Sequence, residues 1–328
     1  MLHALPLISP AEIEHAARLL RAGRLVAFPT ETVYGLGANA LDAEAVARIY
    51  AVKGRPATSP LIVHVASIEM AQSLVAAWPD TADHLARKFW PGPLTLVLPM
   101  SHVGTGAFSS PTIPLIVTAG LPTVGLRMPA HSIALALIQA AGVPLAAPSA
   151  NRFTQLSPTT ADHVRRSLGS DVDYILDGGP CHVGIESTVL SLAEPQPILL
   201  RPGAISRLQI EAVIGPITSA ADPVPGAHAA PGMHPRHYSP HTTLFLVTAG
   251  KLPEQGQGIY LQHQHPPTRT DVPARQMPPS AADYAAVLYQ QLHEADAGNY
   301  DWIAVDLPPN TPDWEAIYDR LHRAASNS

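Results

Sequence analysis

Hydrophobic positions along the first two hundred residues switch between a helical and a strand-like spacing. Residues 10–22 carry Ile13, Ala17 and Leu20 at helical spacing and precede the apolar run 25–28. The same alternation predicts helices at 42–52, 67–77, 81–89, 132–141 and 160–168, and strands at 61–65, 94–98, 123–128, 145–147, near 174 and at 186–192. The pattern predicts an α/β domain built on a mixed sheet and ending near residue 205.

The composition changes to proline, glycine, alanine and histidine between residues 215 and 241. Such a stretch is typical of a semi-rigid connector. Beyond it, the pattern predicts a strand at 243–248, a proline-rich loop at 266–279, a helix capped by Ser280, a strand at 302–305 and a last helix from Asp313. We therefore expect three parts, namely a domain at 1–208, a linker at 209–241 and a smaller α/β domain at 242–328.

Composition and charge narrow the class of protein. The 328 residues are 46% hydrophobic, which supports a core in both domains, and the net charge of -6 argues against a protein that coats nucleic acid. Any RNA contact is then expected to be weak and local. The single cysteine, Cys181, excludes an internal disulfide and a cysteine-based zinc site and is compatible with a reducing compartment. No apolar run is long enough for a membrane span, and a capping box at Ser9–Glu12 stands where a signal peptide would need an apolar run. A soluble, cytoplasmic protein is predicted.

Polar groups concentrate in the segment 29–37, which directly follows an apolar run. It combines the hydroxyls of Thr30, Thr32 and Tyr34 with the carboxylate of Glu31 and two glycines. An ordinary turn needs the glycines but not three hydroxyls, so the composition indicates a binding loop. A plain hairpin or strand-to-helix turn is the alternative.

A second cluster, Lys53-Gly54-Arg55-Pro56, lies at the end of a predicted helix. Lysine occurs three times in the chain, and here it stands beside an arginine and a glycine that lets a ligand approach the backbone. Phosphate is the ligand that this pattern favours. The alternative is that the two cations only complement the helix dipole.

Further polar groups stand at the ends of predicted strands, where an open α/β sheet places its ligand groups. They are Ser149 and Asn151 after 145–147, Ser157 before the next helix, Arg127 within an apolar run, Ser187 beside Glu186, and Arg201. Taken singly, several could be turn formers, while a buried arginine needs an anion or a carboxylate. No phosphate-binding loop or dinucleotide fingerprint is present. His234, His237 and His241 lack thiol partners, so no metal site from protein side chains is predicted.

These segments together resemble a known family. The stretches PTETVYGLG, KGRP, PLIVH, PSAN, GIESTV and RPGAI, in this order and spacing, resemble the YrdC-like domain of threonylcarbamoyl-AMP synthases. Residues 231–240 and the extra domain resemble the long form of that family, so the resemblance covers essentially the whole chain. It implies a YrdC-like twisted mixed sheet with a concave, positively lined cavity, a proline-rich linker over the active site, and a small Rossmann-like α/β domain.

The resemblance also implies an activity. Members combine L-threonine, bicarbonate or CO2, and ATP into threonylcarbamoyl-AMP and pyrophosphate, and a partner transferase passes the threonylcarbamoyl group to tRNA next to the anticodon. Mg²⁺ is expected with ATP, held by the nucleotide and water. The rival hypotheses are an RNA-binding or ribosome-associated YrdC-like module, which the acidic net charge disfavours, and a carbamoyl-adenylate domain for hydrogenase maturation, which needs cysteines that this chain lacks.

The residue roles implied by the resemblance fall into two groups. The residues expected to hold L-threonine are Thr32, His64, Arg127, Ala147 and Ser187, with Arg127 facing the carboxylate and Tyr34 walling the pocket. Those expected at ATP are Arg55, Ser59, Thr123, Ser149, Asn151, Ser157, Arg201 and Tyr238, with Lys53 and Arg55 as the catalytic pair and Lys53 facing phosphate. Glu31 and Glu186 are assigned ordering roles only. Two positions depart from the family pattern, since Ser59 stands where many relatives carry asparagine and Thr154 where a glycine often follows the PSAN motif.

Overall fold

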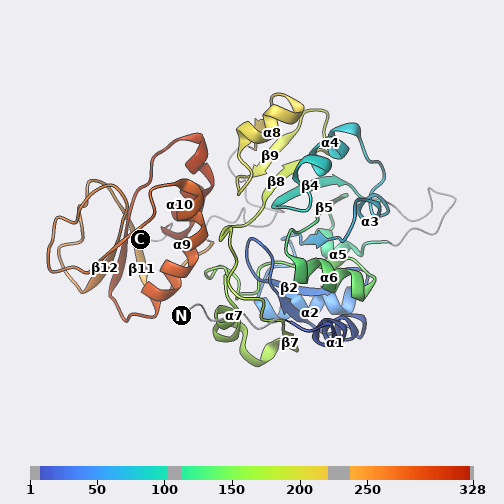
Figure 1. Cartoon of the computed structure of the whole chain (residues 1–328), viewed down its shortest axis with the longest axis horizontal. Helices are drawn as coiled ribbons and strands as arrows, with labels where there is room; N and C mark the ends of the chain where they lie inside the picture. Colours follow the sequence, from blue (N-terminus) through green and yellow to red (C-terminus); the bar gives the residue numbers. More distant parts are fainter. Residues whose placement is uncertain (1–7, 102–111, 221–236, 326–328) are drawn as a thin grey trace.

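The computed structural model describes residues 8–101, 112–220 and 237–325. Two α/β parts lie side by side, with the C-terminal part at the left of Figure 1 in orange and red. Residues 221–236 of the expected linker lie outside the described residues. Within the described ranges, no helix is long and apolar enough to cross a membrane.

The larger part is built on a mixed ten-stranded sheet, as the sequence predicted. Its strand order is β10-β9-β8-β4-β5-β3-β6-β2-β1-β7. The strands are β1 (Val26–Phe28), β2 (Gly35–Asn39), β3 (Ile62–His64), β4 (Leu94–Pro99), β5 (Thr123–Arg127), β6 (Leu145–Ala146), β7 (Tyr174–Ile175), β8 (Thr188–Ser191), β9 (Ile198–Arg201) and β10 (Thr218–Ser219). Parallel pairing of β3 with β5 sets His64 opposite Arg127, and antiparallel β6 lies on the other side of β3. This pairing brings several polar strand ends to one place.

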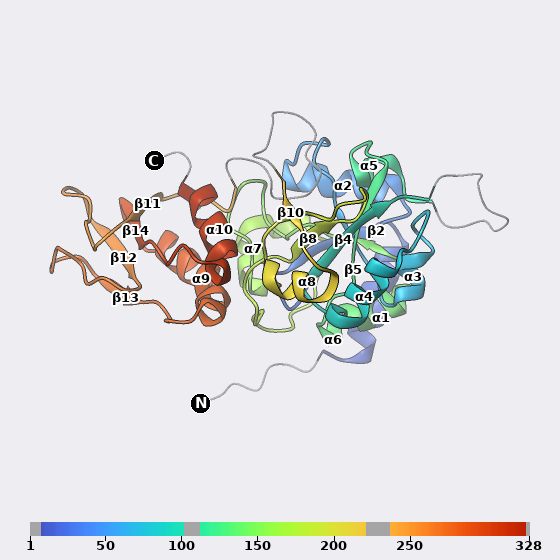
Figure 2. The ribbon, with the colours of Figure 1, turned by 90° about the horizontal axis from the view of Figure 1, so that it is seen from above.

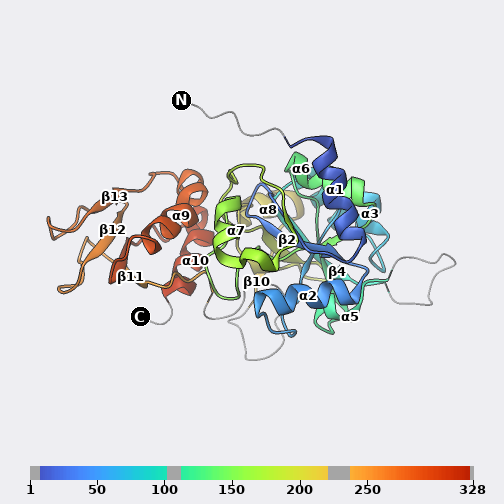
Figure 3. The same cartoon turned by 90° about the horizontal axis from the view of Figure 1, so that it is seen from below.

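Helices cover both faces of this sheet. They are α1 (Pro10–Arg21), α2 (Ala43–Lys53), α3 (Ile68–Gln72), α4 (Asp80–Phe89), α5 (Leu115–Thr118), α6 (Ser132–Ala141), α7 (Ala161–Leu168) and α8 (Arg207–Ile214). Figure 3 shows α1 and α6 side by side on one face, with α2 and α5 on the other. Local sequence defines the ends of α2, because Asp42 accepts backbone N–H groups at its start and Gly54 adopts a φ of 63° at its end. Lys53 and Arg55 are thereby fixed at a helix terminus.

The smaller part carries a parallel four-stranded sheet with the order β11-β14-β12-β13. Its elements are β11 (Thr243–Val247), β12 (Gly258–Gln262), β13 (Ala274–Gln276), α9 (Ala281–Asp296), β14 (Trp302–Asp306) and α10 (Glu315–Ala325). In Figures 1 and 2, α9 and α10 lie between this sheet and the larger part. The two helices are therefore the elements through which the smaller part meets the larger one.

Most predicted elements are found within a few residues of their predicted bounds, and three predictions need correction. The segment 29–37 is not one loop, because Gly35–Asn39 form β2, where a Cβ placed on Gly37 would lie only 2.7 Å from Phe28 Cε1. Strands β12 and β13 were not predicted. The larger part continues past residue 208, since α8 runs to Ile214 and β10 pairs with β9.

The two parts pack backbone against backbone at Gly184. This glycine has a φ of 77°, and a Cβ placed on it would lie 2.3 Å from the carbonyl oxygen of Ala285 and 2.6 Å from Cα of Ala286, both in α9. Neither atom is at the end of a flexible side chain. A side chain at position 184 would push the loop and α9 apart.

We expect Gly184→Ala to destabilise the protein by about 1–3 kcal/mol more than Gly120→Ala. Gly120 has a similar φ of 79° but open space around its Cα, so its substitution measures the backbone strain alone. Urea unfolding of both variants and the wild type measures the difference. Equal destabilisation would mean that the two parts do not meet as closely as described.

Candidate active site

A polar pocket opens where the segment after β1 meets the ends of β3, β5, β6, β8 and β9. Nine of the residues predicted for the site line it, namely Thr32, Arg55, His64, Arg127, Ala147, Ser149, Ser187, Arg201 and Tyr238. The remaining space is about 50 Å³, which is room for a few water molecules. Tyr238 and His237, which lie near the C-terminal end of the expected linker, are buried and line the pocket themselves. A ligand larger than a few water molecules therefore has to displace these two side chains.

Arg127 and the segment Thr30–Val33 form one wall of the pocket. Arg127 Nη2 donates to Thr32 Oγ1 at 2.9 Å and forms an ion pair with Glu31 Oε1 at 2.8 Å. The backbone turn is fixed by Thr30, whose Oγ1 accepts from Val33 N and donates to the Val33 carbonyl. Among the described residues, neither oxygen of Glu31 accepts a hydrogen bond, and Arg127 Nε donates none. Buried polar atoms without partners are what a polar ligand would satisfy.

Tyr34 does not wall the pocket, contrary to our prediction. Its hydroxyl donates to the Gly179 carbonyl at 2.7 Å, and its ring belongs to the hydrophobic core of the larger part. Tyr34 directly precedes β2, and its neighbours Val33 and Gly35 line the pocket while its own side chain packs into the core.

His64 is held as a neutral imidazole. Burial and then the positive charge of Arg127 lower its pKa to about 3, from an ordinary value of 6.5. Its Nδ1 has no hydrogen-bond partner among the described residues. A neutral ring with one unused nitrogen can hydrogen-bond to an amine or hydroxyl without adding charge to the pocket.

Lys53 lies behind the pocket and does not line it. Its Nζ donates to the carbonyls of Ser149, at 2.5 Å, and Asn151. Burial and the neighbouring Arg55 hold the pKa of Lys53 well below its ordinary value. The prediction that this lysine faces phosphate is not supported by this arrangement, in which it fixes the loop that carries Ser149. Arg55 lines the pocket, and its guanidinium donates to Ser59 Oγ and the Pro60 carbonyl.

Four other predicted residues lie around the pocket and not in its lining. Ser59 accepts from Arg55, and Ser157 Oγ donates to Glu186 at 2.6 Å. Asn151 Nδ2 donates to the carbonyls of Arg152 and Gln155, both at 2.8 Å. Thr123 lines a separate small cavity that shares Ile62 with the main pocket. These side chains hold neighbouring segments in place.

Two residues near the pocket adopt a positive φ that side chains other than glycine rarely take. Thr154 has a φ of 70°, which explains physically why glycine suits this position and why a threonine here is strained. Tyr238 has a φ of 62° and is buried, with its hydroxyl unpaired among the described residues. Strain in a buried aromatic residue at a pocket is typical of a functional position.

Positive charge dominates the pocket. Arg55, Arg127 and Arg201 line it, and Lys53 lies directly behind. The positive charges also act on His237. Burial, and then the charges of Arg55, Lys53, Arg201 and Arg320, hold the pKa of His237 well below its ordinary value. Such a field favours anionic groups such as carboxylates and phosphates. Among the described residues, no group of three histidine, cysteine or acidic side chains is placed to hold a metal ion.

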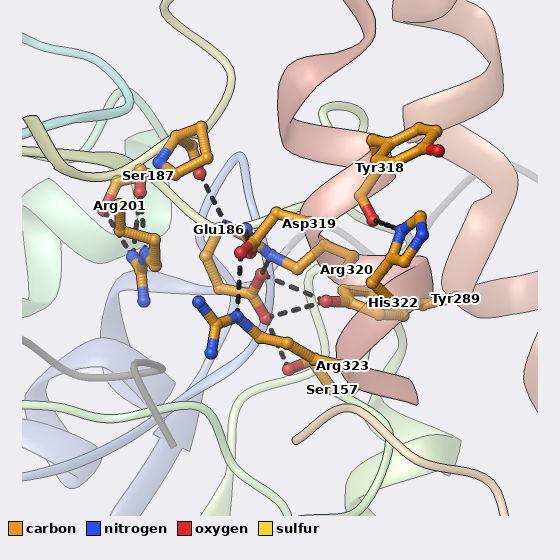
Figure 4. Close-up of polar contacts among 11 residues, drawn as sticks. Ser157, Glu186, Ser187, Arg201, Tyr289, Tyr318, Asp319, Arg320, His322 and Arg323 are labelled. Carbon is orange, nitrogen blue, oxygen red and sulfur yellow. Dashed lines mark hydrogen bonds and ion pairs between the residues drawn. The ribbon is translucent and has the colours of Figure 1, made fainter. Parts of the chain in front are cut away.

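The wall formed by Glu186 and Ser187 contacts the smaller part, which the sequence did not indicate. Glu186 accepts from Arg320 Nε at 2.8 Å and from the hydroxyl of Tyr289, two residues of α10 and α9 (Figure 4). Arg320 and Glu186 are 134 positions apart in the chain, and Arg320 is one of several charged residues along its helix. No local signal distinguishes it.

Residues 18–203 match the protein family described as "Telomere recombination", and residues 205–326 match the family described as "Threonylcarbamoyl-AMP synthase, C-terminal domain". The chain belongs to the threonylcarbamoyl-AMP synthase family. It is 43% identical to the threonylcarbamoyl-AMP synthase of Bacillus subtilis (strain 168), over 96% of this chain and 93% of that protein. It is 49% identical to the Pyrococcus abyssi (strain GE5 / Orsay) threonylcarbamoyl-AMP synthase, over 72% of this chain and 68% of that one.

A solved structure agrees with this assignment over both parts of the chain. The crystal structure of P. abyssi Sua5 complexed with L-threonine superposes with a TM-score of 0.88 at 40% sequence identity, covering 98% of this chain and 96% of that one. The fold predicted from the family resemblance, a YrdC-like domain followed by a small α/β domain, is therefore confirmed.

Two histidines stack across the contact between the parts. His163 of α7 and His293 of α9 have ring centroids 3.8 Å apart. Burial, and then the neighbouring His293 and Arg166, lower the pKa of His163 to about 3. Burial lowers the pKa of His293 to about 4. The folded protein keeps both rings neutral where unfolded histidines, with a pKa of 6.5, take up protons. The stability that this contact provides is present above pH 6.5 and is lost as the pH falls toward 4.

In the wild type, the free energy of unfolding should fall as the pH is lowered from 7 to 5. We expect His163→Gln to reduce the slope of this fall by an amount that corresponds to close to one proton per molecule, because a glutamine does not titrate. The measurement is urea unfolding at several pH values. His15→Gln, at an exposed position of α1, should keep the wild-type slope. An unchanged slope in His163→Gln would show that this ring is protonated in the folded protein.

Proposed function

We propose that the chain makes threonylcarbamoyl-AMP and pyrophosphate from L-threonine, bicarbonate or CO2, and ATP. The observation that carries the proposal is family membership over both parts of the chain, with 96% of it matched by the B. subtilis synthase. The positively charged pocket fits this reaction, because threonine and ATP both bring anionic groups.

The threonine site proposed here is the wall formed by Thr32, His64, Arg127, Ala147 and Ser187. Arg127 faces the carboxylate and can offer it the unused Nε, while the oxygens of Glu31, which are ion-paired with Arg127 but accept no hydrogen bond, can accept from an amine. Neutral His64 adds a hydrogen bond without repelling or neutralising the substrate. The crystal structure of the P. abyssi relative was determined with L-threonine, which supports the choice of ligand.

The ATP site proposed here is the opposite side of the pocket, with Arg55, Arg201, Ser149 and Tyr238 in the lining. Arg55 keeps its charge at neutral pH, since burial lowers its pKa only to about 10. Ser59, Asn151 and Ser157 act by holding Arg55, the Ser149 loop and Glu186, and Thr123 serves the neighbouring cavity. Lys53 acts through the Ser149 loop, a change from the phosphate contact first expected.

Mg²⁺ is proposed as a companion of ATP and not as a resident ion. Within the described ranges no metal-ligand cluster exists, and Glu186, a carboxylate in the pocket lining, is already engaged by Arg320, Tyr289 and Ser157. The residues present thus do not form a Mg²⁺ site, which fits an ion held by phosphates and water.

The chemistry needs positioning and charge stabilisation. The neutral amine of threonine attacks CO2 and loses a proton, giving a carbamate. A carbamate oxygen then attacks the α-phosphorus of ATP, and pyrophosphate leaves. Holding the two reactants together and stabilising the charge on the phosphates with Arg55 and Arg201 lowers the barrier without a protein nucleophile.

The wider setting is also a proposal. We infer that the product passes to a partner transferase that modifies tRNA next to the anticodon, and that the reaction takes place in the cytoplasm. The alternative, an RNA-binding module, would need clustered surface cations, and the net charge is -6.

The direct test is pyrophosphate release by the purified protein with ATP and Mg²⁺. We expect release only when L-threonine and bicarbonate are both present, and none with L-alanine, which lacks the side-chain hydroxyl. Arg55→Gln should lower kcat/KM at least about 100-fold because a pocket charge is lost. Arg87→Gln, on an exposed helix face, is the matched control and should match the wild type. Release independent of threonine would contradict the proposed function.

A further inference from the structure

Arg320 of α10 is 1% exposed and reaches out of the smaller part into the wall of the pocket. Its Nε donates to Glu186 Oε2 at 2.8 Å, and its Nη2 donates to the Pro202 carbonyl at 3.1 Å. Its Nη1 is paired with Asp319 at 2.6 Å, and its guanidinium lies 5.0 Å from the ring centre of Tyr238. The Arg320 side chain thus contacts three separate segments, namely those that carry Glu186, Pro202 and Tyr238.

Glu186 is the centre of this cluster. Besides Arg320, it accepts from Ser157 Oγ at 2.6 Å and from the hydroxyl of Tyr289 at 3.1 and 3.2 Å. Burial acts to raise the pKa of Glu186, but the charges of Arg320 and Arg201 and the bond from Ser157 hold it below its ordinary value. The carboxylate is charged and saturated with donors, so its geometry is fixed by residues from both parts.

The two segments that Arg320 bridges each carry a pocket residue. Ser187 follows Glu186, and Arg201 precedes Pro202. Arg201 itself donates to the Ser187 carbonyl at 2.8 and 3.2 Å. The segments are in direct contact, since a Cβ on Gly203 would lie 2.3 Å from Thr188 N. A small shift of Glu186 or Pro202 would therefore move Ser187 and Arg201 within the pocket.

We propose that Arg320, assisted by Tyr289, is a positioning residue of the reaction. It sets the place of Ser187 and Arg201 through Glu186 and Pro202, and it provides the surface on which Tyr238 rests. The smaller part thereby completes the wall between the two substrate sites. The identity of the substrates in this inference rests on the proposed function. The positioning of Ser187 and Arg201 by Arg320 does not depend on it.

The test compares Arg320→Ala, Arg320→Lys and Arg275→Ala in the full-length protein. Arg275, on β13, is partly exposed and is paired with Glu294 of α9 within the smaller part, so its removal is the matched loss of an arginine. We expect Arg320→Ala to lower kcat/KM for L-threonine at least about ten-fold, since small displacements of binding groups have effects of this size. Arg320→Lys should not restore it, because an ammonium cannot donate along both directions of the guanidinium fork.

A readout independent of activity is amide hydrogen exchange. Arg320→Ala should speed exchange in segments 186–191 and 198–203 at least about ten-fold, while β12 and β14 keep wild-type protection. A structural loss of the smaller part would instead raise exchange in β12 and β14. If Arg320→Ala does not fold, Tyr289→Phe, which removes one hydroxyl from Glu186, is expected to give a smaller change in the same segments.

The proposal is overturned if Arg320→Ala matches Arg275→Ala in kcat/KM and exchange, or if Arg320→Lys restores both to within two-fold of the wild type. A wild-type protein that releases no pyrophosphate would refute the proposed function alone, since the exchange experiment still decides whether Arg320 holds these segments.

Discussion

A single buried carboxylate links the pocket to the domain contact. Glu186 cannot remain charged in the interior without donors, because an uncompensated buried charge costs several kcal/mol. Its donors come from Ser157 in the larger part and from Tyr289 and Arg320 in the smaller one. Neutralising this charge therefore requires that the two parts dock, and docking places Ser187 and Arg201 where they line the pocket.

On the opposite side of the pocket, the buried charges are positive, and oxygen atoms compensate them. Arg127 is buried beside Glu31, and Lys53 is surrounded by carbonyls at the start of the Ser149 loop. Each cation thus holds a segment of backbone while adding to the positive field of the pocket. The field that favours anionic substrates and the contacts that shape the site come from the same side chains.

Residues that lie in a contiguous sequence motif could be assigned to the pocket from the sequence. The strand that contains or precedes such a motif also places the motif in the sheet. Thr32, His64 and Arg127 are of this kind. The direction of Lys53 could not be predicted, since it depends on carbonyls about a hundred positions away. Arg320 and Tyr289 were missed for the same reason. Strand β12 was missed because it lies just before a proline-rich loop, and its partner strands supply the pairing that its sequence alone does not indicate.

The most direct test of this account is a double-mutant cycle on Glu186 and Arg320, with L-threonine affinity measured by calorimetry. Glu186→Gln and Arg320→Met each remove one charge of the pair, and the double variant removes both. If the pair positions the pocket, the losses in binding free energy should be non-additive by about 1 kcal/mol or more. Losses that add to within about 0.3–0.5 kcal/mol would contradict the claim that this contact couples the smaller part to the threonine site.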